Sequence, residues 1–545
     1  MGLEIINRVI MTTWVSPGGK FWFIGAAALA ACTLALIGFR SISDPLWSDE
    51  FLTTSLLQAN SLPKLWGGIA LGIDGNPPLY LTLLWLVLHG LPEAISTVAL
   101  LKLINLGFAA GGVAVLCMLA RRLATSAACW IGALMIITLG EAFTYVASEL
   151  RTYALYFLTA SLAALLQQRL IEDRCTLNLI PLATVNIGLA MCHTFGIVYV
   201  CIIALAGWLS EPRDKQLLRA IIVAIAPSII AVIAWSPVLL GQLQVAKPYT
   251  WILPPSLSDL SDTLFRSNAV LWISVFEAAC LLTVFAPANN KHGIEFRNVI
   301  NERRWQPARF IALLFLGFTS FTLLAWLFSR LVFPLFVPRF FTPQLFTTFA
   351  LHVAFGAWLL SNLGPRREII AALCILIAPL MLNNVLVHTR AWMHRQPICA
   401  NEQGGYFESS QVQGDLAIIS DSPHIFLPRA TYAVHSEAYR FPLDWDVVLK
   451  YPDQSRGNAV DYHIMNGLRT WMPMTQVMST EEILRQNSQF LVVDMPLRSW
   501  FRNLRATHDV VAEKLSEVRL SETDDISCTL WKVTRVSHRT PLRAG

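Results

Sequence analysis

The chain has 545 residues, of which 55% are hydrophobic and only 14% are charged. A soluble globular protein carries roughly 25% charged residues. The composition therefore excludes a soluble globular protein and indicates a membrane protein with many spans. The net charge of +5 does not indicate a nucleic-acid-binding protein, because the basic residues fall in short clusters between apolar stretches and are better explained as topology signals.

The first apolar stretch, residues 21–39, is long enough to cross a bilayer. It is also longer than the apolar region of a typical signal peptide, so we expect an uncleaved anchor. Arg8 and Lys20 precede it, and the positive-inside tendency then places the N-terminus in the cytoplasm. The sequence WSDEF, at residues 47–51, is therefore expected on the far side of the membrane.

The next segment, residues 41–97, is expected to be a long external loop. It contains two apolar stretches, FLTTSLLQANSLPKLWGGIA (51–70), of mixed polarity, and PPLYLTLLWLVLHGL (77–91), which is short for a crossing. If the second stretch crossed the membrane, Arg121 and Arg122 would lie outside, against the positive-inside tendency. We therefore predict helices in this loop that lie in the membrane interface.

The remaining apolar stretches predict a polytopic α-helical membrane protein with about eleven transmembrane helices, a cytoplasmic N-terminus and an external C-terminal tail. Residues 1–386 are expected to form this transmembrane domain. After the first span, the expected spans are 98–120, 127–147, 153–166, two short crossings within 177–209, then 221–240, 269–286, 310–328, 345–360 and 369–382.

The tail, residues 387–545, differs in composition and is expected to be a separate soluble domain. GDLAIIS (414–420) and SQFLVVDMP (488–496) are short β-rich apolar runs beside turn residues. Helix-like stretches such as STEEILRQN (479–487) alternate with them, which favours a small α/β domain. No glycine-rich nucleotide loop follows either strand, so no cofactor is assigned to this domain.

The cysteines divide into two groups. Eight of the ten lie in or beside apolar spans, where free cysteine behaves as a small buried hydrophobe. Cys399 and Cys528 lie in the polar tail, and they could pair as a disulfide if the tail faces an oxidising compartment.

Ionisable residues at membrane level are costly and are therefore candidates for function. In the expected topology such residues collect on the outer side of the membrane, together with aromatic ones. Carboxylates alone would indicate cation handling, whereas carboxylates together with Arg and Lys indicate a base and an anion-holding site. The candidates are Asp49, Glu50, Asp74, Tyr80, Glu149, Arg151, Tyr153, His193, Lys247, Trp251 and Arg339.

This set of side chains fits glycosyl transfer from a sugar linked to a lipid phosphate. An acceptor hydroxyl must lose a proton as it attacks the anomeric carbon, so a carboxylate within hydrogen-bond reach serves as general base. The leaving lipid phosphate gains negative charge, which Arg or Lys stabilises. Trp47, Tyr80 and Trp251 can pack on the apolar face of a sugar.

Three motifs resemble those of the GT-C glycosyltransferases. They are the Asp-Glu pair after the first span, D-x-N-P-P-L-Y (74–80) and E-L-R-T-Y-A-L (149–155). The resemblance is to the bacterial branch with protein O-mannosyltransferases, lipid A aminoarabinose transferases and rhizobial lipopolysaccharide sugar transferases, and it covers about residues 21–360. It implies a GT-C fold, and it agrees with an interfacial helix in the first external loop.

The resemblance also implies roles for individual residues. Asp49 maps to the catalytic base and Glu50 is its partner in the pair. Asn76 stands where many members have His, so no role of that His is carried over. The residues expected near the donor or its phosphate are Glu149, Arg151, Tyr153, Arg339, Phe340 and Pro343.

Structural explanations exist for several candidates. Glu50 could equally orient a loop, Asp74 could form a turn before a proline, His193 could be a satisfied core histidine and Lys247 could only snorkel. The His and Cys residues show no zinc-ligand spacing, so no metal is assigned. A divalent ion on paired carboxylates remains an alternative.

We therefore expect an inverting glycosyltransferase that moves a sugar from a polyprenyl-phosphate donor to a hydroxyl acceptor at the periplasmic face of a bacterial inner membrane. The acceptor could be an envelope glycan, a lipid or a protein, and the sugar is open. One alternative is a transporter or flippase of lipid-linked saccharides, although transporters place charges near the midplane and often show repeats. Another is a polysaccharide polymerase or ligase that uses a lipid-diphosphate donor.

Overall fold

The structure is a computed structural model. It describes residues 17–92, 97–139, 141–246, 252–265, 268–285, 306–362, 399–400, 405–409, 416–444, 446–447, 458–495, 498–519 and 527–536. The chain divides into two compact units. The helical unit comprises Met1–Asp44, Val87–Ala234 and Pro254–Met393, and the mixed unit comprises Pro45–Leu86, Trp235–Leu253 and His394–Gly545.

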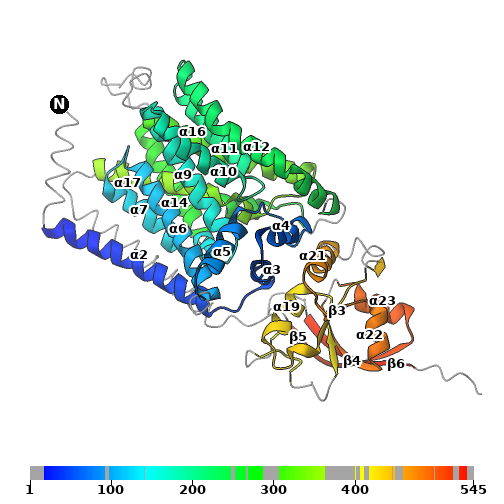
Figure 1. The fold of residues 1–545 in the computed structure, drawn as a ribbon. Coiled ribbons are helices and arrows are strands. Elements are labelled where there is room, and N and C mark those ends of the chain that lie inside the picture. Colours follow the sequence, from blue (N-terminus) through cyan, green and yellow to red (C-terminus); the bar gives the residue numbers. More distant parts are fainter. Residues whose placement is uncertain are drawn as a thin grey trace, which may run out of the picture. The chain divides into compact units, whose positions relative to one another are not determined.

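Long apolar helices form the helical unit (Figure 1). Within it α6 packs on α9, α9 on α11, α11 on α16, and α7 on α17. The helices and 3-10 turns are α2 (Pro17–Ser43), α6 (Val98–Ala120), α7 (Ser126–Leu139), α8 (Glu141–Ser148), α9 (Tyr153–Glu172), η1 (Thr176–Asn178), α10 (Leu179–Ala190), α11 (Gly196–Ser210), α12 (Lys215–Ala246), α13 (Leu257–Phe265), α14 (Asn268–Phe285), α16 (Gln306–Leu331), η4 (Pro338–Gln344) and α17 (Leu345–Asn362).

Four helices of the described residues are long and apolar enough to cross a membrane, or up to six if each bent helix pair counts as one span. The predicted span 98–120 coincides with α6, and 177–209 holds two helices, α10 and α11, as expected. The predicted span 127–147 consists of two helices at 73° to one another. The span predicted at 369–382 lies outside the described residues, and the total of about eleven stays a prediction.

The segment predicted to be the first external loop contains three short helices, α3 (Ser48–Leu57), α4 (Leu62–Ala70) and α5 (Leu79–Gly90). They occupy the two stretches that the sequence predicted to be helical without crossing the membrane. Gly72 follows α4 with a φ of 80°, a left-handed conformation that costs glycine little. A Cβ at this position would also meet the His463 ring, so glycine is required there for two reasons.

The tail folds as an α/β sheet, which confirms the predicted mixed character. The strand order is β3-β2-β1-β4-β6-β5. Strands β3, β2, β1 and β4 run parallel to one another, and β6 is antiparallel to both of its neighbours, β4 and β5. The elements are β1 (Ala417–Ile419), α19 (Pro423–Tyr432), η5 (Ser436–Ala438), β2 (Tyr439–Pro442), α21 (Asn458–Trp471), β3 (Val477–Met478), α22 (Thr480–Gln486), β4 (Gln489–Asp494), α23 (Trp500–Thr507), β5 (Val510–Arg519) and β6 (Ser527–Arg535).

Apolar side chains of one face of this sheet form a core with the helices that cover it, and Ile418 and Leu491 on the other face are buried as well. Ile419 of β1 and Val492 of β4 pair in register, and both are buried with Ile483 and Trp500 from the covering helices. The two predicted apolar runs are thus neighbouring central strands, as expected for strands buried on both faces.

A disulfide and a buried ion pair connect the start of the tail to later parts of it. Cys399 and Cys528 form a disulfide across 129 residues, the pairing that the sequence left open. Arg429 forms a buried ion pair with Glu408, and the Tyr439 hydroxyl donates to the same carboxylate at 2.9 Å. A buried ion pair is tolerated when further hydrogen bonds satisfy it, as here.

The mixed unit includes the external loop as well as the tail. The indole N–H of Trp471 in α21 donates to the Lys64 carbonyl of α4 at 2.8 Å, and the Tyr432 hydroxyl of α19 receives the Leu46 backbone N–H at 3.3 Å. The predicted domain boundary at residue 386 lies outside the described residues and stays a prediction.

Candidate functional site

The Asp-Glu pair lies in the first turn of α3, where acidic side chains interact favourably with the helix dipole. The Glu50 carboxylate accepts a hydrogen bond from the Trp47 backbone N–H at 3.2 Å and is only 3% exposed. Glu50 therefore caps the helix, which agrees with the alternative that Glu50 orients the loop. Asp49 precedes it on the same turn and is half-buried.

Contacts to α19 fix this turn. The Ser48 hydroxyl lies 2.6 Å from Nδ1 of His424. One turn further along α3, the Phe51 ring packs against Tyr432 with centroids 5.5 Å apart. Because Ser48 is adjacent to Asp49, His424 positions the backbone that carries the predicted base.

Asp74 and Tyr80 lie further along the same loop, and both are buried. Oδ1 of Asp74 accepts hydrogen bonds from the backbone N–H and the side-chain amide of Asn76, at 2.8 and 2.9 Å. This is an Asx turn, which Asp supports by bonding the backbone two residues on. Gln242 of α12 donates to the carbonyls of Ile69 and Asp74 at 2.9 and 3.1 Å, so Asp74 belongs to a fixed turn.

In the helical unit, residues 149–152 form the tight turn between α8 and α9. The Asn105 side-chain amide of α6 donates to the carbonyls of Val146 and Glu149, at 3.0 and 2.6 Å. The Thr152 hydroxyl donates to the Cys192 carbonyl at 2.8 Å. These bonds connect the E-L-R-T-Y turn to the turn that carries His193, although the two lie far apart in sequence.

Aromatic rings and two arginines surround His193. Its ring stacks on Tyr156 with centroids 4.7 Å apart and lies 5.2 Å from Phe340 and 6.0 Å from Tyr153. His193 is 2% exposed, and its Nδ1 accepts the Phe195 backbone N–H at 3.1 Å.

Arg339 reaches this cluster from η4. Its Nη1 donates to the Tyr145 hydroxyl at 3.2 Å, and Tyr145 also hydrogen-bonds to the Glu149 carboxylate. The structure thus brings together five predicted site residues in the helical unit: Glu149, Arg151, Tyr153, His193 and Arg339.

The charge of the cluster around His193 lies on its arginines and not on the histidine. Burial, together with the positive charges of Arg151 and Arg339, lowers the pKa of His193 to about 3. His193 is therefore neutral at physiological pH, and it packs as a buried core histidine. The positive charge belongs to the two guanidiniums, whose planar N–H groups suit phosphate oxygens.

Sequence reasoning missed three polar residues of this region. Tyr145 links Arg339 to Glu149, Asn105 holds the turn, and Lys102 donates to the carbonyls of Ser41 and Asp44 at 2.6 and 3.2 Å. Lys102 and Asn105 stood within an apolar span at i, i+3, the spacing of one helix face. A charged residue inside a span is a functional or structural signal in itself.

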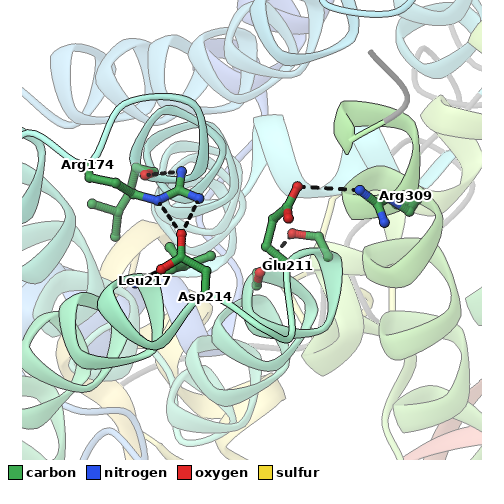
Figure 2. A network of polar contacts seen from close by, with 8 residues as sticks. Arg174, Glu211, Asp214, Leu217 and Arg309 are labelled. Atoms are coloured by element: carbon green, nitrogen blue, oxygen red, sulfur yellow. Dashed lines mark hydrogen bonds and ion pairs between the residues drawn. The ribbon is translucent and has the colours of Figure 1, made fainter. Parts of the chain in front are cut away.

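Charged loops elsewhere in the helical unit form a separate network (Figure 2). Arg174 pairs with Asp214 at 2.8 Å, and Arg309 with Glu211 at 3.4 Å. Oδ1 of Asp214 also accepts the Leu217 backbone N–H at 2.9 Å, at the start of α12. These charges connect helix ends to one another and have no place in the proposed chemistry.

Three of the earlier predictions need separate comment: two further site residues, a metal site and the meeting of Asp49 with the arginines. Lys247 and Trp251 lie outside the described residues. Within the described part of the chain, no group of three or more His, Cys, Asp or Glu side chains could hold a metal ion. The predicted meeting of Asp49 with the arginines joins residues of both units and stays a prediction.

Comparisons with known proteins gave similarity at the level of structure. No model of a known family matches the chain, and no curated protein matches it in sequence. The crystal structure of ArnT from Cupriavidus metallidurans bound to undecaprenyl phosphate is similar, with a TM-score of 0.51 and 11% identity, over 94% of this chain and 98% of that chain. The apo structure of the same protein gives a TM-score of 0.51 and 12% identity over the same shares. This likeness shows the fold of the chain, a mostly helical membrane protein with several apolar spans and a C-terminal mixed α/β sheet, similar to that of ArnT.

Proposed function

We propose that the chain is a GT-C glycosyltransferase that uses a polyprenyl-phosphate-linked sugar as donor and transfers the sugar to a hydroxyl acceptor. The observation that carries this proposal is the cluster of Arg151 and Arg339 around neutral His193. The similarity to ArnT, solved with undecaprenyl phosphate, supports the choice of donor.

The arginine cluster suits the donor phosphate. Because His193 is neutral, the two guanidiniums carry the positive charge of this cluster, and that charge attracts an anion. Buried surroundings strengthen their attraction to charge that develops on the leaving phosphate. Tyr153 and Phe340 supply aromatic surface beside His193, where an apolar sugar face could pack.

Asp49 is proposed as the general base. It would take the proton of the acceptor hydroxyl while the acceptor oxygen bonds to the anomeric carbon and the bond to the lipid phosphate oxygen breaks. Attack opposite the leaving group inverts the anomeric configuration. The half-buried carboxylate on a capped helix turn supports this role, because a base must be both held in place and open to its substrate.

The proposed location is a bacterial inner membrane, with the N-terminus in the cytoplasm and the tail in the periplasm. The disulfide between Cys399 and Cys528 supports this orientation, since disulfides persist in the periplasm and are rare in the cytosol. The basic clusters between the predicted spans support it independently.

The test is turnover of undecaprenyl-phosphate-linked sugars by the purified full-length protein. Asp49→Asn should lower the rate roughly 100-fold or more while donor binding is retained. Asp259→Asn, an acidic residue in the first turn of α13, is the matched control and should leave the rate unchanged. Movement of lipid-linked sugar across proteoliposomes without any transfer would instead identify a transporter, and wild-type rates in Asp49→Asn would remove Asp49 from its role.

A further inference from the structure

A cavity of about 520 Å³ opens on the tail, at the end of β4 and beside α23. Three arginines line it, Arg498, Arg502 and Arg505, together with the carboxylate of Asp494. Nothing in the proposed glycosyl transfer uses these residues. Met495, Phe501 and Ala506 complete the lining.

The cavity lies at the carboxyl end of β4, one of the two strands between which the direction of the strand order changes. From β1 the chain proceeds to β2 and β3 on one side, whereas from β4 it proceeds to β5 and β6 on the other side. The boundary between β1 and β4 is therefore a topological switch point. Ligands of open α/β sheets bind outside the carboxyl ends of the strands at such a point, and Asp494 is the last residue of β4.

Arg502 and Arg505 lie on α23, and Arg498 precedes the helix by two residues. The spacing of three residues between Arg502 and Arg505 corresponds to neighbouring positions on a helix surface. Arg498 pairs with Asp461 at 2.8 Å and donates to the Asp421 carbonyl at 3.3 Å. The Arg505 guanidinium lies over the Trp531 ring, 5.4 Å from its centroid, which restrains the side chain.

The carboxylate in the cavity is compatible with an anion. Burial, and then the negative charge of Asp421, raise the pKa of Asp494 to about 7, although Arg502 and Arg505 act in the opposite direction. Near neutral pH a large share of the Asp494 carboxyl groups therefore carry a proton. In that form the group donates a hydrogen bond to an anion and adds no repulsion.

We propose that this cavity binds a phosphomonoester, with Arg502 and Arg505 as its charged contacts and Arg498 as the residue that fixes the cavity edge. Guanidiniums bind phosphate oxygens through paired N–H groups. The phosphomonoester belongs either to a soluble saccharide or to a lipid headgroup, and both present the same group to the arginines. The site is independent of Asp49 and of the arginine cluster in the helical unit, so it holds or fails separately from the proposed function.

The experiment is calorimetric titration of full-length protein in detergent with glucose 6-phosphate, with glucose as the uncharged probe. Exchange of both Arg502 and Arg505 for Gln should weaken binding of the phosphate ester roughly 10-fold or more. A matched double variant, Arg485→Gln with Arg519→Gln, removes the same charge from exposed positions outside the cavity and should bind like the wild type.

A second variant separates binding from folding. Asp494→Asn removes a negative charge that faces Arg502, Arg505 and Asp421, so at pH 8 it should bind glucose 6-phosphate more tightly than the wild type. The source of the group is resolved by a parallel titration of nanodiscs that contain phosphatidic acid. The proposal would be overturned if the wild type and the Arg502/Arg505 variant bound glucose 6-phosphate and phosphatidic acid with equal affinity. It would also be overturned if the wild type bound neither of these two phosphate esters.

Discussion

The start of α3 in the mixed unit and the His193 cluster in the helical unit are built in different ways. Asp49 is half-buried, on a turn held by the contact between Ser48 and His424 and by the Glu50 carboxylate, which accepts the Trp47 backbone N–H. His193 is 2% exposed and enclosed by aromatic rings. A proton acceptor must remain open to a hydroxyl that arrives from water, whereas an anion site gains strength from a dry, apolar surround. Each proposed role thus lies in the environment that favours it.

The strongest way to test this difference is Arg339→Gln. Loss of a guanidinium from the buried cluster should lower kcat/KM roughly 100-fold to 1,000-fold, with weaker donor binding as part of the loss. Arg339→Lys keeps the charge but not the planar N–H pair, so it should restore activity only partly. Arg330→Gln, on an exposed arginine at the end of α16, is the control. Donor binding that is unchanged in Arg339→Gln would contradict the assignment of phosphate to this cluster.

Removal of the disulfide should affect the mixed unit alone. Exchange of Cys399 and Cys528 for Ser should lower the free energy of unfolding of that unit by about 2–4 kcal/mol, because the cross-link closes a long loop of the unfolded chain. Thermal unfolding with and without a reducing agent measures the effect. The described cysteines of the helical unit are free, so Cys129→Ser should leave the response to the reducing agent unchanged. An identical response in wild type and double variant would contradict the role of this disulfide.

His424→Ala tests whether the tail positions Asp49. It removes the contact to Ser48, and the resulting displacement of the base should lower kcat roughly 10-fold to 100-fold. The KM for the donor should stay the same, because the arginine cluster is untouched. His424→Asn retains a polar partner and should recover part of the rate, and His435→Ala, on an exposed histidine of the same domain, is the control. A parallel change in the donor KM would indicate a general structural effect.

The smallest effect is expected in the loops of the helical unit. Arg174→Gln breaks the half-exposed pair with Asp214, and such pairs contribute about 0–1 kcal/mol. Activity should be unaltered, and the melting temperature in detergent should fall slightly. A large loss of activity would mean that this network (Figure 2) contributes to function.

Sequence patterns predicted the elements well where apolar runs end at clear signals. The span 98–120 coincides with α6, which the Thr97 hydroxyl caps. By contrast α9 continues to Glu172, beyond the predicted end at Leu166. Gln167 and Gln168 are buried in this extension, and the Gln168 amide N–H donates to the Gln306 side chain of α16 at 3.3 Å. One sequence does not reveal such a partner.

The sequence singled out some residues of the His193 cluster and not others, and the roles of all of them stay predictions. Arg151 and Arg339 attracted attention because charge at a span end is costly, and they do lie near His193. Tyr145, which joins Arg339 to Glu149, gave no signal because a tyrosine in an apolar span is ordinary. The short strands β2 and β3 were missed for a related reason, since two to four residues form a strand only beside an existing neighbour.

The contact between Leu46 and Tyr432 joins residues 386 positions apart. At the usual speed of the ribosome, this interval corresponds to about 20 to 80 s between synthesis of the two partners. The loop that carries Asp49 must wait that long for the part of the chain that holds it. A product that stops short of the tail would insert its helices yet present an unsupported Asp-Glu turn, so completion of translation would itself act as a checkpoint for activity.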